Sequence, residues 1–284
     1  MLSEPLDLHH QSLLHHRLRS IPVPISEFSF PNLYLFRATH RHEVVRDGEE
    51  IWIRGRSYDG RSYLMPTKDA REMDPDHLGR MAGTVDHLYP VPEEWLTAFP
   101  SADFTRTFDE ADSDYLYQTE RIANFAGKRL HKKKNLLNFF LKHYSHDAEP
   151  LTEERVPDAI SILDEWQAES GEKEEYTDYA PAREALQRMD ELVLCGGIWY
   201  ADGQPSGYIL GEEITSDTYA LHFAKGLTRY KGIYQYIFSS FASVLPGMYT
   251  HLNMEQDLGK EALRHSKESY FPEKKLVKWR VALC

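Results

Sequence analysis

Two carboxylates follow a short apolar segment near the end of the sequence. Residues 249–252 read as a strand, and Asn253, Glu255 and Asp257 come directly after it. A carboxylate held at the end of a strand can take a proton from an attacking amine or hydroxyl, so Glu255 and Asp257 are candidate catalytic bases. For Asp257 the alternative is a structural one, the N-cap of a helix that we expect from about residue 258.

Cationic side chains recur along that expected helix. Lys260, Arg264 and Lys267 are spaced i, i+4 and i+7, which places them on one helix face. The candidate ligands for an anionic acceptor, the molecule that the amine or hydroxyl belongs to, are Asn253, Arg264 and Lys267. The alternative is a helix face whose charges are simply solvated.

A second candidate site is a loop that follows an expected strand at residues 219–223. The loop contains Arg229, Lys231 and Gly232, and an apolar helical pattern begins directly after it. Helix N-termini bind anions through their N–H groups and dipole. These three residues are therefore candidate ligands for the phosphate groups of a co-substrate that donates the transferred group. Arg229-x-x-Gly232 is half of the Arg/Gln-x-x-Gly-x-Gly/Ala pattern of acyl-CoA N-acyltransferases, although Tyr234 replaces the last small residue. A phosphate loop and a solvated turn both remain open.

The segment "GKRLHKKKNLLNFFLKHY", residues 127–144, is basic in a chain whose formal net charge is −12. Leu137, Phe140, Leu141 and Tyr144 recur at helical spacing, which predicts an amphipathic helix. Lysine stems lying over apolar surface explain part of the pattern, but not the exclusion of acids. A phosphate-bearing ligand would explain it, and the candidate ligands here are Lys132, Lys133 and Lys134.

Four histidines near the N-terminus suggest a metal site at first sight. His9/His10 and His15/His16 are adjacent pairs without the i, i+4 spacing that places two ligands on one helix face. No cysteine or carboxylate accompanies them in the segment. We therefore expect no metal site.

The elements that must position these residues form an α+β pattern that occurs twice. In each half a helical segment is followed by a meander of strands with Asp-Gly turns, at Asp47-Gly48 and Asp59-Gly60 in the first and Asp202-Gly203 in the second. A plan that repeats in this way indicates two tandem domains. We expect an N-terminal domain at residues 1–147 and a C-terminal domain at residues 148–284, which carries the active cleft.

Composition narrows the class of protein. A hydrophobic fraction of 41% over 284 residues is typical of a folded globular chain, and no window is apolar enough to span a bilayer. Two cysteines, Cys195 and Cys284, and no signal-peptide pattern indicate a reducing, cytoplasmic location. The acidic balance argues against a protein that coats long nucleic acids. Nothing in the sequence calls for a tightly bound cofactor, and the oligomeric state is undetermined.

Three segments together resemble the phosphatidylglycerol lysyltransferase C-terminal domain family. They are "DYLYQTERIANFAGKRLHKKKNLLNFFLKHY", "ALHFAKGLTRYKGIYQYIFSSFA" and "LNMEQDLGKEALRHSKESYFPEKKL", and their order and spacing agree across most of the chain. The resemblance implies two tandem GNAT-like domains, each with a mixed, mostly antiparallel sheet flanked by helices. The chain is most similar to the stand-alone soluble members, many of which have no assigned substrate.

The resemblance also implies an activity. Membrane members of the family move an aminoacyl group from a charged tRNA to a lipid headgroup, so we expect an acyltransferase with aminoacyl-tRNA or acyl-CoA as co-substrate. Its acceptor would be a small molecule or a lipid headgroup, with the charged tRNA 3′ end as a partner, and the basic helix of the first domain would border the cleft. Met254 and Ala224 stand where the family often has Arg and Glu. Two alternatives remain: a small-molecule acyl-CoA N-acyltransferase, or a non-catalytic module that binds an anionic headgroup or nucleotide.

Overall fold

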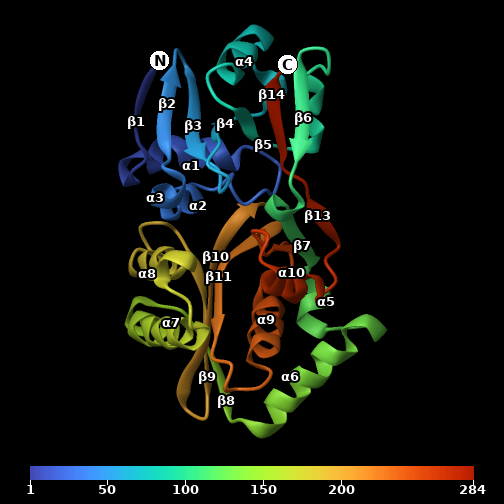
Figure 1. Cartoon of the computed structure of the whole chain (residues 1–284). Helices are drawn as coiled ribbons and strands as arrows, with labels where there is room; N and C mark the ends of the chain where they lie inside the picture. Colours follow the sequence, from blue (N-terminus) through green and yellow to red (C-terminus); the bar gives the residue numbers. More distant parts are fainter. The chain divides into compact units, whose positions relative to one another are not determined.

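The computed structural model describes all 284 residues and contains two compact units. Unit 1 comprises residues 1–114, 256–261 and 275–284, and unit 2 comprises residues 115–255 and 262–274. Each unit is built around one seven-stranded sheet with helices packed against it, so the expected α+β class is confirmed (Figure 1). No helix combines the length and apolar character that crossing a membrane requires.

The sheet of unit 1 has the strand order β1-β2-β3-β4-β5-β14-β6. The meander β2-β3-β4 is antiparallel, whereas β5 pairs parallel to β4 after helix α4. The elements of this unit are β1 Leu2–Pro5, the 3-10 turn η1 Leu8–His10, α1 Gln11–Arg19, α2 Phe30–Leu35, α3 Arg37–His40, β2 Glu43–Asp47, β3 Glu50–Arg56, β4 Ser62–Pro66, α4 Pro75–Ala82, β5 His87–Val91, β6 Phe104–Phe108 and β14 Trp279–Leu283.

The second sheet has the strand order β13-β7-β12-β11-β10-β9-β8. Its meander β9-β10-β11 is antiparallel, and β12 pairs parallel to β11 after helix α9. The elements are β7 Asp114–Gln118, α5 Thr119–Asn124, α6 His131–His143, β8 His146–Pro150, α7 Val156–Ser170, α8 Tyr179–Gln187, β9 Cys195–Ala201, β10 Gln204–Thr215, β11 Thr218–Gly226, α9 Ile233–Val244, β12 His251–Asn253, α10 Glu261–Glu268 and β13 Lys274–Leu276.

The two sheets repeat one plan. Each has a three-stranded meander, then a helix, then a strand parallel to the last strand of the meander. Next to that parallel strand each sheet takes an antiparallel strand from the other half of the sequence, β14 beside β5 and β7 beside β12. The duplication expected from the sequence is therefore present, with one strand exchanged between the halves.

This exchange explains why the units differ from the domains expected at residues 1–147 and 148–284. Strand β7 and helices α5 and α6 precede residue 147 but belong to unit 2, while β14 at the C-terminus belongs to unit 1. The basic helix α6 is thus part of the second unit and not of the first. Phe140 of α6 stacks on Tyr236 of α9, with ring centroids 4.5 Å apart, which fixes α6 within that unit.

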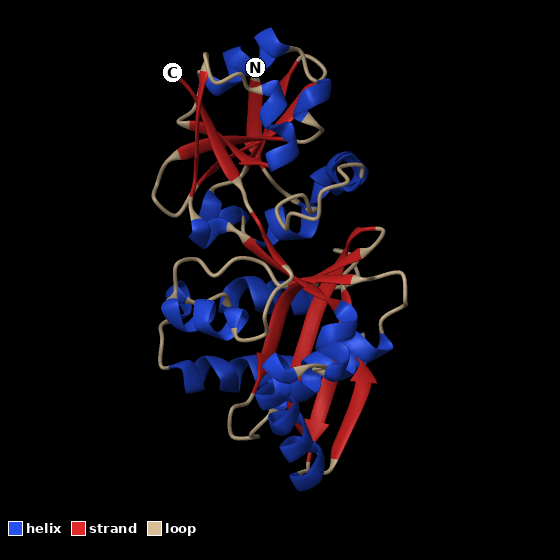
Figure 2. Cartoon of the chain, turned by 90° about the vertical axis from the view of Figure 1, so that its right-hand side faces the viewer, coloured by secondary structure: helices blue, strands red, loops and turns tan.

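Helices cover both faces of the sheet of unit 2 (Figure 2). Successive side chains of β9 point to opposite faces of the sheet. The Trp199 indole donates to Ser240 of α9 on one face, and the Tyr200 hydroxyl donates to Asp158 of α7 on the other. Helix α9 lies over a closely packed core that includes Ile209, which is fully buried. The sheet with its two helical layers is the scaffold on which the candidate site is built.

Candidate active site

The site lies where the two parallel strands of unit 2 part. The ladder between β11 and β12 ends at the pair Ala220 and Asn253, and β11 then continues to Gly226 beside β10. Two residues after this point, His222 is the extra residue of a β-bulge, because Leu210 pairs with Phe223 and Gly211 pairs with Leu221. A bulge changes the direction of a side chain within a strand, and here it aims His222 away from the regular alternation.

His222 is held between two carboxylates. Its Nε2 lies 2.9 Å from Glu212 Oε1 on β10, and its Nδ1 lies 2.7 Å from Glu255 Oε1 beyond β12. Burial alone would lower the pKa of His222, but the two carboxylates reverse this and raise it to about 10. The imidazole is therefore protonated at neutral pH, with two negative charges facing one positive charge. We call Glu212, His222 and Glu255 the buried relay.

The backbone around Glu255 has a special conformation. Glu255 has φ +58°, which only a minority of non-glycine residues adopt, and its N–H donates to the side-chain oxygen of Asn253 at 2.7 Å. The Lys267 ammonium from α10 donates to the carbonyl oxygens of Met254 and Glu255 at 2.6 and 3.1 Å. Three of the expected site residues, Asn253, Glu255 and Lys267, thus lie together. Lys267 holds the turn, which is a different task from the acceptor binding expected of it.

Asp257, the second expected base, is buried and bonded to the backbone of its own turn. Asp257 belongs to unit 1, is fully buried, and its carboxylate accepts the Gly259 N–H at 2.8 Å. Helix α10 begins only at Glu261, so Asp257 forms a turn before the helix and is not its N-cap. Arg264 lies half-buried on α10 in unit 2. Glu255 and Asp257, the two candidate bases inferred from the sequence, therefore belong to different units.

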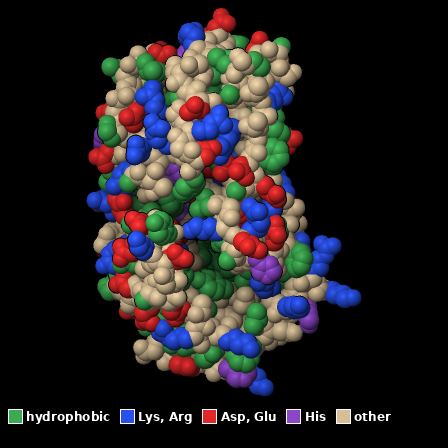
Figure 3. Space-filling view, in the orientation of Figure 1, with side chains coloured by type: hydrophobic (Ala, Val, Ile, Leu, Met, Phe, Trp, Pro, Cys, Tyr) green, Lys and Arg blue, Asp and Glu red, His purple; other side chains and the backbone are tan.

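The basic helix and the loop before α9 meet at one concave surface. Lys132 of α6 and Lys231 of the loop line a groove of about 360 Å³ with Asn135, Leu136 and Phe139. The Lys231 ammonium lies 4.7 Å from the centre of the Phe139 ring. Lys and Arg side chains gather over this part of unit 2 (Figure 3). We call these five residues the α6 groove, where one lysine of the basic helix and one lysine of the loop before α9 come together.

The other cations expected to hold phosphate have protein partners. Arg229 forms ion pairs with Glu165 and Glu169 of α7, so its charge is already compensated. The Lys133 ammonium lies 3.8 Å over the Tyr270 ring, and burial lowers the pKa of Lys133 to about 8. The remaining lysine of the trio, Lys134, donates to the carbonyl oxygen of Asn124 at the end of α5 at 2.9 Å. Of the six residues expected to bind phosphate, Lys132 and Lys231 line the α6 groove.

Glycine is required where the loop touches α6. Gly232 has φ +93°, and a Cβ at this position would lie 2.4 Å from the carbonyl oxygen of Leu136. We expect Gly232→Ala to reduce the free energy of unfolding more than Gly203→Ala, which has φ +73° and nothing within 4 Å of a Cβ. The control measures left-handed strain alone, about 1–2 kcal/mol, and the backbone contact adds to it at Gly232. Urea denaturation compares them, and equal losses would contradict a tight loop–helix contact.

Sequence reasoning missed two of the three relay residues. His222 and Glu212 are ionisable residues within otherwise apolar strand segments, "LHFAK" and "YILGEEI". Charged side chains inside a buried strand require partners, and this signal could have pointed to them. Their pairing with Glu255 depends on the bulge at His222, which the sequence pattern does not reveal.

Comparison with known proteins places this arrangement in context. A conserved protein of unknown function from Bacteroides thetaiotaomicron superposes with a TM-score of 0.88 at 23% identity, over 99% of both chains. FemX superposes at 0.59 with 9% identity over 100% of this chain and 98% of its own, and L-PGS from Bacillus licheniformis at 0.58 with 12% identity over 85% and 83%. These likenesses show the fold, which is the expected tandem GNAT-like one.

Two matches concern the sequence itself. An uncharacterised protein of Mycoplasmoides gallisepticum is 24% identical over 196 residues, which are 66% of this chain and 61% of that protein. The match therefore spans less than two thirds of that relative. The family described as phosphatidylglycerol lysyltransferase, C-terminal, matches residues 19–282, nearly the whole chain. The chain belongs to this family.

Proposed function

We propose that the chain is an acyltransferase of aminoacyl-transfer type, with its reaction centre at the buried relay of unit 2. The observation that carries the proposal is the ion pair between Glu255 and a protonated His222 at the point where β11 and β12 part. Strained backbone at Glu255 and a bulge at His222 are features that cluster at active sites. The family and the likeness to FemX and L-PGS favour transfer of an aminoacyl group.

The step itself is a direct transfer. The acceptor nitrogen or oxygen attacks the carbonyl carbon of an ester or thioester donor, and the bond from that carbon to the leaving oxygen or sulfur breaks. The proton of the acceptor passes to Glu255, and Glu255 returns it to the departing oxygen or sulfur, so that no proton is gained or lost overall. No covalent enzyme intermediate is needed, so the protein contributes mainly positioning and proton removal.

His222 and Glu212 would support that role of Glu255. The protonated imidazole fixes the orientation of the Glu255 carboxylate through its 2.7 Å hydrogen bond, and Glu212 keeps the imidazole protonated. Met254, which replaces an arginine often found in the family, is buried in the core beside Glu255.

On the donor side we assign the α6 groove to the phosphate groups. Lys132 and Lys231 provide positive charge there, and α9 begins directly after Gly232 with its N–H groups at that end. Arg229 has a smaller role in this assignment than the sequence suggested, because Glu165 already compensates its charge. The acceptor would be an amine or hydroxyl compound, with a lipid headgroup as one candidate.

A transfer assay with purified protein tests the function. We would offer radiolabelled aminoacyl-tRNA and acyl-CoA donors with amine and phosphatidylglycerol acceptors, and measure label in the product. We expect turnover with one donor class. The donor that is used distinguishes an aminoacyl-tRNA enzyme from an acyl-CoA N-acyltransferase. Absence of turnover with every donor, together with binding to anionic vesicles, would favour the non-catalytic module.

With the active donor, we expect Lys132→Ala combined with Lys231→Ala to raise KM for the donor roughly tenfold with little change in kcat. The two charges contact a part of the donor that is remote from the reacting bond, so they contribute binding that is equal in the ground and transition states. Lys142→Ala is the matched control, because Lys142 lies on the same helix, is exposed and does not line the α6 groove. If the double variant has the same KM for the donor as the control, the α6 groove does not bind the donor.

A further inference from the structure

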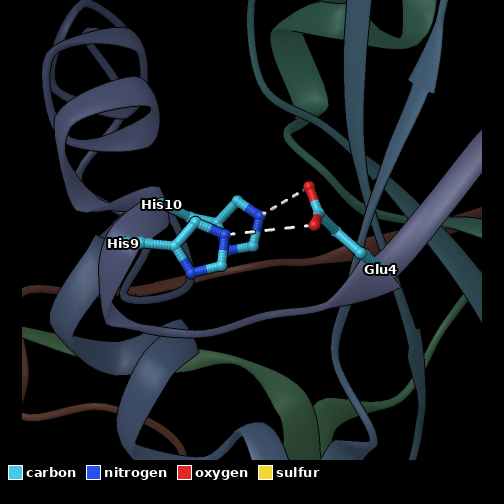
Figure 4. A group of neighbouring side chains, drawn as sticks. All are labelled: Glu4, His9 and His10. Atoms are coloured by element: carbon cyan, nitrogen blue, oxygen red, sulfur yellow. Dashed lines mark hydrogen bonds and ion pairs between the residues drawn. The ribbon is translucent and has the colours of Figure 1, made fainter.

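A carboxylate and two imidazoles meet at the N-terminal edge of unit 1 (Figure 4). Glu4 lies on the edge strand β1, and His9 and His10 lie in η1, so the three come from two different elements. Their ligand atoms all lie within 4.8 Å of one another. The sequence predicted no metal site, because the histidine pairs lack the i, i+4 spacing and no cysteine or carboxylate accompanies them in their segment. The chain turns between β1 and η1 and so places the Glu4 carboxylate beside the two imidazoles.

The distances suit one ion shared by three ligands. His10 Nε2 lies 3.1 Å from Glu4 Oε1, and His9 Nε2 lies 4.0 Å from Glu4 Oε2. Ligand atoms around a tetrahedral Zn²⁺ with bonds of 2.0–2.1 Å are separated by about 3.3 Å. Both separations are within reach of this value through small side-chain rotations, because Glu4 and His9 are exposed.

Burial and backbone hydrogen bonds fix the ring of one of the three ligands. The His10 ring is 1% exposed, and its Nδ1 lies 3.2 Å from the carbonyl oxygen of Asp7 and 3.1 Å from the Asp7 backbone nitrogen. The Asp7 N–H donates to Nδ1 in one tautomer, and Nδ1–H donates to the Asp7 carbonyl oxygen in the other. Metal binding selects the second tautomer, in which Nε2 presents its lone pair to the site. The buried ring therefore presents one nitrogen to Glu4 and anchors the other in the turn.

We propose that Glu4, His9 and His10 bind one divalent transition-metal ion of the Zn²⁺ class. Two imidazole nitrogens and one carboxylate are a set that Zn²⁺ accepts, with water completing four-coordination. Mg²⁺ and Ca²⁺ prefer oxygen ligands, so this site disfavours them. The ion would join β1, whose four residues are exposed, to η1 and so hold the edge strand in place. The inference concerns unit 1 alone and does not depend on the transferase proposal.

The test is metal binding by the full chain without an affinity tag. We expect one equivalent of Co²⁺ to give visible absorption of the intensity typical of four-coordinate sites, and Zn²⁺ to displace it while excess Mg²⁺ does not. Glu4→Gln and His9→Gln are exposed changes that leave the buried His10 ring intact. Each should weaken Zn²⁺ binding in calorimetry more than tenfold, since loss of a hydrogen-bond partner of a metal ligand alone costs about 10–100-fold.

The matched control is His15→Gln combined with His16→Gln. These residues are also adjacent histidines, and they belong to no cluster of metal-ligating side chains in the structure. The control should bind Zn²⁺ as the wild type does. Wild-type binding that the control weakens as much as His9→Gln does would overturn the assignment. Four-coordinate Co²⁺ absorption that is missing from the wild type would overturn it too, leaving Glu4 and His10 as an ordinary ion pair.

Discussion

Replacing Lys278 by methionine is expected to lower the free energy of unfolding of unit 1 by about 3–5 kcal/mol. The Lys278 ammonium is fully buried and lies 2.6 Å from Glu27 and 2.6 Å from Asp114, with Ser26 and Gln256 as further hydrogen-bond partners. Burial alone would lower the pKa of Lys278, but the two carboxylates outweigh it and raise the pKa above its ordinary value. Methionine has a similar length, so the change removes the charge and leaves little empty space.

The expected cost arises from what remains after the substitution. Asp114 is fully buried and Glu27 is nearly so, and without the ammonium two negative charges face each other in a medium that solvates them poorly. The cluster also joins segments that are distant in sequence: Asp114 immediately precedes the part of β7 that belongs to unit 2, and Gln256 immediately follows Glu255. Loss of the cluster therefore loosens the chain of unit 1 at these two connections.

Lys275→Met is the matched control for this prediction. Lys275 lies three residues earlier and pairs with Glu110 at 2.7 Å, but Glu110 is 60% exposed, so the same substitution should cost less than about 1 kcal/mol. Urea denaturation gives the free energies, and hydrogen exchange in β2, β3 and β4 reports on unit 1 separately. Adding Glu27→Gln and Asp114→Asn to Lys278→Met should recover part of the loss, because no uncompensated charge then remains. A Lys278→Met protein as stable as the control would show that the cluster is not a stabilising one.

Local signals made much of the fold predictable. Asp202 and Gly203 have φ +52° and +73°, as expected for an Asp-Gly hairpin turn, and they connect β9 to β10. The apolar spacing of residues 137–144 predicted α6 and two of its buried side chains, Leu137 and Phe140, correctly. Leu141 was assigned to the same face but is 40% exposed, because α6 packs on α9 along a narrower stripe. Turn chemistry and periodicity depend on residues close in sequence, which is why they could be interpreted.

Long-range pairing was not predictable in the same way. The exchange of β7 and β14 between the sheets joins residues more than a hundred positions apart, and a repeat in the sequence pattern suggests two contiguous domains instead. The same limit applies to charges. Arg229 was expected to hold phosphate, but Glu165 and Glu169 come to it from α7, some sixty residues earlier. Which cation has a protein partner is decided by the packing of α7 on the sheet.

In the candidate site, one residue was indicated by a local sequence pattern and another depends on long-range contacts. Glu255 was recognised because a carboxylate directly after a strand is a local pattern, and the structure places it at the end of β12 with φ +58°. His222 was not recognised, since its role requires a one-residue bulge and partners on two other elements. In the proposed mechanism, the hydrogen bond from His222 orients the Glu255 carboxylate.

We expect Glu255→Gln to lower kcat about 10²–10⁴-fold with the donor that the transfer assay identifies, while the protein stays folded. Glutamine has the same shape and can still accept a hydrogen bond from His222 Nδ1, so the geometry of the relay is kept. What it loses is the ability to take a proton from the acceptor. The effect should appear in kcat and in kcat/KM together, because proton removal belongs to the transition state.

Glu273→Gln is the matched control, since Glu273 also pairs with a histidine, His251 Nε2 at 3.1 Å, at an exposed position of the same unit. It should change kcat less than twofold. Glu212→Gln tests the positioning role, because it removes a negative charge from the far side of His222 without touching Glu255. We expect the alkaline limb of its pH–rate profile to move to lower pH, because Glu212 is one of the two carboxylates that raise the pKa of His222. A Glu255→Gln enzyme that turns over as fast as the Glu273→Gln enzyme would mean that another group removes the proton and that the buried relay only supports the fold.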